Sequence, residues 1–225
     1  MEDTVVYLVP LGHDRYELYS EPPEEPASEP SADDGFFRTR IERLREGWRS
    51  MVQAARRSQS SDSRLARWRD WAVSRIAESV AEQRTLWSLR SIEAADLQYP
   101  SDLSHSAATT LCRGLLAHAR GYHGRWLIGD GLLFVASGAL ALVPGPNVLA
   151  YYFGLRMVGH LLSWRGARQG LDRIMWRLRP EPALAELATL ANEPRESRAT
   201  RVQAIASRLK LPKLAAFFDR AAVPG

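Results

Sequence analysis

Cysteine and lysine are both scarce in this chain. The one cysteine among its 225 residues, Cys112, excludes an internal disulfide and a cysteine-based metal site, and it suits a reducing compartment. Of the 30 basic residues only Lys210 and Lys213 are lysine, so arginine supplies almost all of the positive charge. Arginine suits phosphate or carboxylate partners, although a GC-rich genome would produce the same bias. Composition alone therefore names no partner.

The signals of an enzyme or a cofactor site are also missing from the sequence. It contains no glycine-rich phosphate loop and no internal repeat, and the serines at 104 and 106 lack the context of a nucleophile. His118 and His123 do not share one face of a helix, so their spacing does not predict a metal site. The N-terminus begins with the acidic segment 1–4 and shows neither the basic nor the apolar region of a secretory signal. We expect a non-enzymatic protein without cofactor or metal.

The first 34 residues predict a small β-structure followed by a linker. Residues 4–10 are rich in β-branched and aromatic side chains, residues 15–20 alternate apolar and polar, and 12–14 form a turn signal between them. We therefore expect an N-terminal β-hairpin over 1–20, which must pack on something else to be stable. Residues 21–34 contain four prolines and six acidic residues, a composition typical of an extended acidic linker.

The rest of the chain shows helical periodicity, which predicts a mainly α fold. Apolar residues at helical spacing indicate an amphipathic helical hairpin over 35–98, then a helix plus an apolar helical hairpin over 101–180. A C-terminal region of short helices follows over 181–225, with helices expected at 182–191, 196–209 and 212–221. We thus expect a helical bundle with a central apolar helical hairpin and a small N-terminal β-hairpin.

The central hairpin is defined by its turn motif. Two apolar arms, 126–143 and 148–164, flank the residues Pro144, Gly145, Pro146 and Asn147. The prolines cannot continue a helix and Asn147 can cap the next one, so the arms should be antiparallel. Each arm is about 26 Å long at 1.5 Å per residue, slightly short of a hydrocarbon core of roughly 30 Å. The pattern leaves two interpretations open: a membrane element, or the core of a helical bundle.

Three ionisable residues lie inside these apolar arms. If residues 144 and 147 face each other, Asp130 lies level with His160, and Arg156 lies one turn away on the face of His160. Ionisable groups in an apolar setting cost roughly several kcal/mol each unless they are paired. We therefore expect these three residues to pair, either as a polar relay that senses or moves protons or as a structural ion pair.

Arginines follow the hairpin, and none lies in its turn. A basic collar that includes Arg165, Arg168 and Arg173 would suit the headgroups of an anionic lipid membrane, with both ends of the hairpin facing the cytoplasm. A solvated basic face is the alternative. The C-terminal helices faintly resemble a helix-turn-helix, but residues 214–218 are mostly apolar, so we do not expect nucleic-acid binding. Those residues would rather dock on the core or on a protein partner.

Several segments resemble a known family. The run 139–147, then Tyr151, Arg156 and His160, and the tail 164–168 are similar to the mitochondrial potassium–proton exchange-related family and its bacterial relatives, as are the segments 7–10, 16–19 and 99–101. The resemblance implies a membrane-associated role in potassium–proton exchange and cation homeostasis, as a regulator rather than as the exchanger.

The resemblance carries no catalytic residue over to this chain. High arginine content and no visible transit peptide indicate a bacterial chain, expected at the inner membrane, peripheral or hairpin-inserted, and facing the cytoplasm. The alternative is a cytoplasmic helical scaffold or adaptor that binds another protein or forms a homo-oligomer.

Overall fold

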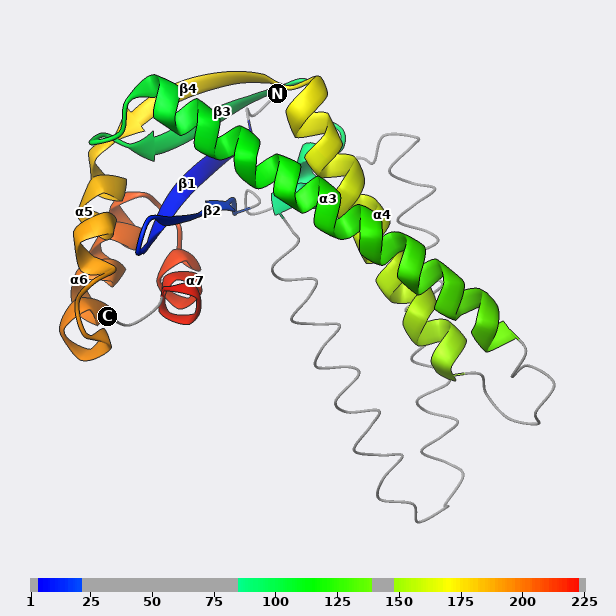
Figure 1. The fold of residues 1–225 in the computed structure, drawn as a ribbon. Helices are drawn as coiled ribbons and strands as arrows, with labels where there is room; N and C mark the ends of the chain where they lie inside the picture. The colour runs from blue at the N-terminus through cyan, green and yellow to red at the C-terminus, as the bar shows by residue number, and fades with distance from the viewer. Residues whose placement is uncertain (1–3, 22–84, 139–147, 223–225) are drawn as a thin grey trace, which may run out of the picture. The chain divides into compact units, whose positions relative to one another are not determined.

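A computed structural model describes residues 4–21, 85–138 and 148–222 (Figure 1). The chain divides into two compact units, which we describe separately. The first unit comprises Met1–Pro23, Arg84–Gly121 and Ser163–Gly225, and the second comprises Glu24–Gln83 and Tyr122–Leu162. Residues 22–34 of the expected linker, most of the helical hairpin expected at 35–98, and the turn at 144–147 lie outside the described residues.

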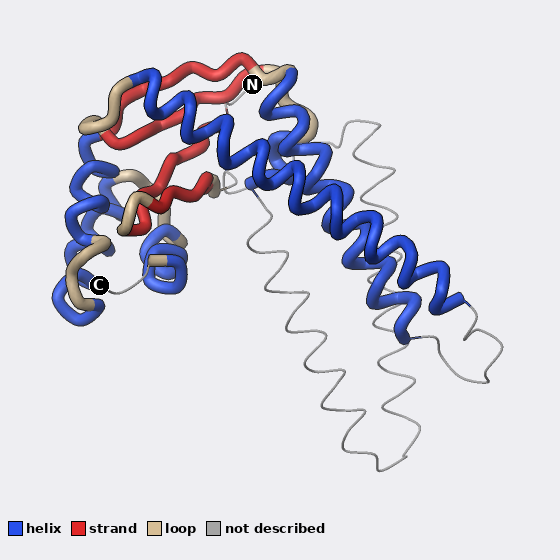
Figure 2. The backbone as a smooth tube through the Cα atoms, viewed as in Figure 1, coloured by secondary structure: helices blue, strands red, loops and turns tan. Residues whose placement is uncertain are grey.

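A four-stranded mixed sheet forms the centre of the first unit (Figure 2). The strand order is β2-β1-β3-β4; β1 pairs with β2 antiparallel and with β3 parallel, and β3 pairs with β4 parallel. The four strands are β1 (Thr4–Gly12), β2 (Arg15–Tyr19), β3 (Ala94–Pro100) and β4 (Met175–Glu181).

The expected fold class, a mainly α helical bundle, is therefore wrong, because this first unit has an α/β fold. The sequence pattern assigned β3 to the end of a helical hairpin and β4 to a basic collar. Each of these strands is only seven residues long, and its partner lies far away in the sequence. Local periodicity does not report such non-local parallel pairing, so only the β1–β2 hairpin could be predicted.

The turn of that hairpin shows why its sequence signal was strong. Gly12 pairs with Arg15 across the strands, which leaves His13 and Asp14 as a two-residue loop. Both loop residues have positive φ angles, 50° and 56°, and Gly12 has φ 88°. Two-residue loops of this kind match the twist of the flanking strands, and Gly and Asp tolerate the left-handed region best.

Alternating side chains of β1 point into two separate apolar clusters. Tyr7, Val9 and Leu11 contribute to one cluster, whereas Val6 and Leu8 contribute to the other. Successive side chains of a strand point to opposite faces of the sheet, so both faces of β1 are buried. A strand buried on both faces needs helices on both sides.

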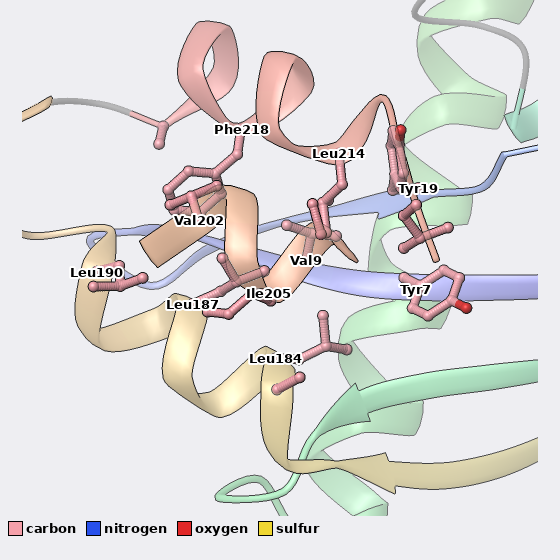
Figure 3. Close-up of a cluster of buried hydrophobic side chains, with 14 of the residues drawn as sticks. Tyr7, Val9, Tyr19, Leu184, Leu187, Leu190, Val202, Ile205, Leu214 and Phe218 are labelled. Carbon is pink, nitrogen blue, oxygen red and sulfur yellow. The ribbon is translucent and has the colours of Figure 1, made fainter. Parts of the chain in front are cut away.

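Three short helices cover the first of these faces (Figure 3). They are α5 (Pro182–Leu190), α6 (Arg195–Arg208) and α7 (Leu214–Ala221), close to the ranges expected from periodicity. Glu181 caps α5, because its Oε1 accepts a hydrogen bond from the Ala183 N–H at 2.9 Å, and Pro182 occupies the first turn. The buried apolar contacts are made by Leu184, Leu187, Leu190, Val202, Ile205, Leu214 and Phe218.

The N-terminal half of α3 covers the other face. Helix α3 (His105–Gly138) buries Ala108, Cys112 and Leu116, spaced four residues apart on one face. They pack in one cluster with Leu97 of β3. Burial raises the pKa of the Cys112 thiol to about 12, so the thiol stays neutral and acts as a small apolar side chain.

The C-terminal part of helix α4 (Val148–Asp172) contacts the segment before β3. The Ser163 hydroxyl accepts a hydrogen bond from the Trp87 indole N–H at 2.9 Å. Gly166 lies so close to Leu86 that a Cβ added to this glycine would lie 1.7 Å from the Leu86 carbonyl oxygen. Glycine is thus required here for a close helix-to-backbone approach.

We predict that Gly166→Ala destabilises the protein by about 3 kcal/mol, because the new methyl group overlaps a backbone atom that cannot rotate away. Gly114→Ala is the matched control, because Gly114 lies inside α3 and a Cβ there would meet no described atom within 4 Å. Gly114→Ala should stabilise the folded protein by roughly 0.5–1 kcal/mol, because alanine has a higher helix propensity than glycine. Urea unfolding measures both, and equal stabilities of the two variants would contradict the packing.

Candidate functional site

The candidate site lies in the second unit, between the C-terminal half of α3 and the N-terminal half of α4, which run side by side (Figure 1). Helix α3 supplies His123 and Asp130, two turns apart on one face. Helix α4 supplies Tyr152, Arg156 and His160 at intervals of four residues. The spacing on each helix directs these side chains towards the other helix.

Asp130 is at the centre of the site. Its side chain is completely buried, with 0% exposure. One carboxylate oxygen, Oδ2, lies 3.2 Å from Arg156 Nε and 3.4 Å from His160 Nε2. The structure thus brings together the three residues singled out from the sequence. Neither carboxylate oxygen has a well-aligned hydrogen bond among the described residues, so the site compensates this carboxylate incompletely.

Arg156 is held in place by aromatic side chains. Its guanidinium carbon lies 5.2 Å from the centre of the Trp126 ring and 5.6 Å from that of Tyr152, and its NH1 donates a hydrogen bond to the Tyr152 hydroxyl at 3.2 Å. Cation–π contacts of this geometry stabilise a guanidinium that is mostly removed from water. Arg156 therefore provides a fixed positive charge beside Asp130.

His123 is a member of the site that sequence reasoning missed. Its Nδ1 lies 2.8 Å from Nδ1 of His160, and each of these residues is 6% exposed. We considered His123 only as a partner of His118. Its position seven residues before Asp130, on the same helix face, was the signal that could have identified it.

Burial dominates the ionisation of these groups. Burial, together with the electrostatic effect of the neighbouring His160, lowers the pKa of His123 to about 4. It lowers the pKa of His160 as well, and Arg156 adds to that effect while Asp130 opposes it. Burial raises the pKa of the Asp130 carboxyl, against the opposing charges of Arg156 and His160. Both imidazoles are therefore neutral at pH 7, and Asp130 is the group pushed towards proton uptake.

Two proton arrangements satisfy the contacts of His160. A neutral imidazole carries one N–H, so an N–H on one ring nitrogen leaves a lone pair on the other. When Asp130 is ionised, His160 directs its Nε2–H at the carboxylate and accepts a hydrogen bond from the Nδ1–H of His123. When Asp130 is protonated, its proton faces His160 Nε2, and the Nδ1–H of His160 faces His123. The three groups form a continuous chain of contacts, which we call the array His123–His160–Asp130.

The other predicted residues lie elsewhere. Arg165 and Arg168 are exposed on α4 and Arg173 follows it, all in the first unit. They line a groove of about 360 Å³, and Arg168 forms an exposed ion pair with Asp172 at 3.6 Å. Two further arginines that follow the hairpin, Arg177 and Arg179, are strand residues of β4. Arg177 and Arg179 of β4 lie 2.7 Å and 3.3 Å from the oxygens of Asp96 on β3.

The described residues contain neither a metal-binding cluster nor a membrane-spanning helix. Within 4–21, 85–138 and 148–222, no group of three or more His, Cys, Asp or Glu side chains is arranged to hold a metal ion. In the same part of the chain, no helix combines the length and the apolar character needed to cross a bilayer.

The fold and the site together define the class of this protein: an α/β unit whose two long helices continue into a second unit with a buried carboxylate–histidine–arginine cluster. The family described as mitochondrial K⁺–H⁺ exchange-related matches residues 6–175, more than half of the chain, and the chain belongs to this family. The match includes every residue of the cluster. It confirms the family predicted from the sequence motifs. No curated protein and no solved structure matched the chain.

We predict that stability falls as the pH is lowered from about 6.5 to about 4. The folded-state pKa of His123, about 4, lies below the ordinary 6.5, so the unfolded chain binds more protons in this window. The lowered pKa of His123 contributes about 3 kcal/mol to the free energy of unfolding at neutral pH, and this contribution is lost over the window. The lowered pKa of His160 acts in the same direction, whereas the raised pKa of Asp130 opposes both, because proton uptake by Asp130 favours the folded state.

Unfolding in urea at pH 7.5 and pH 5 measures this effect. His123→Asn keeps a side-chain N–H for His160 but removes the titrating ring, so its loss of stability between the two pH values should be clearly smaller than that of the parent. His118→Asn, at an exposed position of the same helix, should behave like the parent. An unchanged pH dependence in His123→Asn would contradict the assignment.

Proposed function

We propose that this protein is a non-enzymatic, membrane-associated regulator of potassium–proton exchange, at the cytoplasmic face of a bacterial inner membrane. Its family membership indicates a role related to K⁺–H⁺ exchange. The observation that carries the finer proposal is the buried array His123–His160–Asp130, compensated by Arg156. We assign this cluster the role of a proton-responsive element.

The proton balance of the array supports this role. A proton that arrives at Nε2 of His123 allows its Nδ1 proton to pass to Nδ1 of His160. The Nε2 proton of His160 then passes to Asp130, which becomes a neutral carboxylic acid. One proton has been taken up, both rings are neutral again, the Nδ1–H of His160 faces His123, and the O–H of Asp130 faces His160. The outcome is the second of the two arrangements that the geometry allows.

Proton uptake changes the charge of the cluster. When Asp130 is ionised, its charge balances that of Arg156, and the buried site is neutral overall. When Asp130 is protonated, the guanidinium loses its counter-ion and the site carries one net positive charge. A guanidinium that is mostly removed from water and has lost its counter-ion destabilises the packing around it, which favours rearrangement of the surrounding helices. A local protonation step linked to a change in helix packing is what a pH-responsive regulator requires.

A second candidate function is a helical scaffold or adaptor that binds another protein, in which the cluster serves as a structural ion pair. Exposed apolar side chains on α3 favour a binding surface of some kind. Washing membranes with alkaline carbonate separates the two candidates. Protein that stays on the washed membranes would support the membrane-associated role, whereas protein that is absent even from unwashed membranes would support the scaffold.

The regulatory role predicts that the cluster sets the pH dependence of potassium flux. In membrane vesicles containing the full chain, pH-driven potassium flux should respond to the protein, and Asp130→Asn or His160→Ala should abolish that pH dependence. Because Asp130→Asn leaves Arg156 without a counter-ion, the double variant Asp130→Asn with Arg156→Met removes both charges and guards against misfolding. Asp172→Asn removes an exposed carboxylate at the end of α4, outside the cluster, and should behave like the parent. Unchanged flux in all cluster variants overturns the proposal.

A further inference from the structure

Large exposed apolar side chains are concentrated on one stretch of α3. Within the described residues, every such side chain except that of Met175 lies between positions 122 and 135. All of them belong to the second unit. They are Tyr122, Trp126, Ile128, Leu132, Leu133, Phe134 and Val135.

Three of these side chains form a continuous outward face. Ile128, Leu132 and Val135 follow one another at intervals of four and three residues, which places them on one side of α3. They are 67%, 67% and 74% exposed. We define these three residues as the outer face of α3.

The opposite side of the same helix is polar and buried. His123 and Asp130 point inwards, with exposures of 6% and 0%. A helix of a water-soluble domain has the reverse arrangement, with apolar residues inside and charged residues outside. An apolar outside around an ionisable inside is typical of helices in contact with lipid.

The surrounding residues indicate where a lipid boundary would lie. No charged residue and no histidine occurs from position 131 to position 155. Arg125 is exposed just before the apolar stretch, and Tyr122 and Trp126 are each 43% exposed. Aromatic rings and arginine side chains of this kind are enriched at the level of lipid headgroups, where the ring or the stem is apolar and the other end is polar.

The length of the helix decides how deeply it can reach. From Trp126 to the end of α3 at Gly138 the helix rises about 18 Å. One leaflet contributes about 15 Å to a hydrocarbon core of roughly 30 Å. This part of α3 therefore matches one leaflet rather than a whole bilayer.

We propose that the outer face of α3 inserts into the acyl-chain layer of one leaflet of an anionic membrane, with Tyr122, Arg125 and Trp126 at the headgroups. This inference names the surface responsible for the membrane association in the proposed function, and it rests on that part of the function. A second copy of the chain is a poorer occupant. Three aliphatic side chains fall well short of the 800 Å² or so that each partner of a stable dimer buries.

Sedimentation with vesicles tests the proposal on the full chain. The parent should bind vesicles of phosphatidylethanolamine and phosphatidylglycerol, and bind phosphatidylcholine vesicles more weakly because Arg125 favours anionic headgroups. Leu132→Glu with Val135→Glu should weaken binding roughly tenfold or more, because carboxylates are costly in the acyl layer. Both substitutions are at exposed positions, and circular dichroism verifies that the variant is folded.

Ala117→Glu is the matched control. Ala117 is exposed on the same helix and outside the apolar stretch, so the same added charge there should leave vesicle binding unchanged. Lipids brominated near the headgroup should quench the fluorescence of Trp126 more strongly than lipids brominated at the chain ends. Trp126→Phe should remove this difference in quenching.

Three results would overturn the inference: a parent that does not bind vesicles, a Leu132→Glu, Val135→Glu variant that binds like the parent, or a parent dimer that this variant dissociates. The last result would assign the outer face to a second copy. The double variant Asp130→Asn with Arg156→Met, which removes both charges of the cluster, should bind vesicles like the parent. A failure of lipid insertion is therefore distinguishable from a failure of the proton-responsive cluster, which the flux measurement reports.

Discussion

The burial of one carboxylate is the constraint on which the second unit depends. Asp130 has no access to water, so its charge has to be compensated by other side chains or removed by protonation. Helix α4 provides the compensation through Arg156 and His160, and the pairing sets which faces of the two helices meet. Because Arg156 is always charged whereas Asp130 is not, the compensation is conditional on the protonation state of a single group. The same contacts that hold the helices together can thus respond to pH.

The two sides of α3 have to be considered together. Its inner side carries the ionisable array, and its outer side carries exposed Ile128, Leu132 and Val135. An environment that covers the outer side with lipid would also exclude water from the inner side. The energetic cost of ionising Asp130 would then rise further. Membrane contact and proton affinity are in this way properties of one helix rather than of separate parts of the protein.

Local patterns in the sequence predicted local structure well. The β1–β2 hairpin and the short C-terminal helices depend on residues close in sequence. The convergence of Asp130 with Arg156 and His160 follows from the antiparallel register that the turn at 144–147 predicts for the two helices. Strands β3 and β4 escaped prediction because parallel pairing joins distant segments. The two arginines of β4 also made a strand hard to predict. Arg177 and Arg179 are compensated by Asp96 on the neighbouring strand β3, and the sequence of β4 alone does not indicate this partner. His123 escaped because the predicted register sets His160 level with Asp130, two helical turns away from His123.

The parallel pairing of β3 with β4 has a consequence for how the chain is made. Both long helices lie between these two strands in the sequence, so β4 leaves the ribosome only after the whole of α3 and α4. Until then β3 has one open edge, and cluster residues such as Ile174 are missing from the core of the sheet. Closing so large a loop is entropically costly and slows folding. The nascent chain therefore exposes its two long helices before its sheet is complete, a period in which a membrane or a chaperone has first access to them.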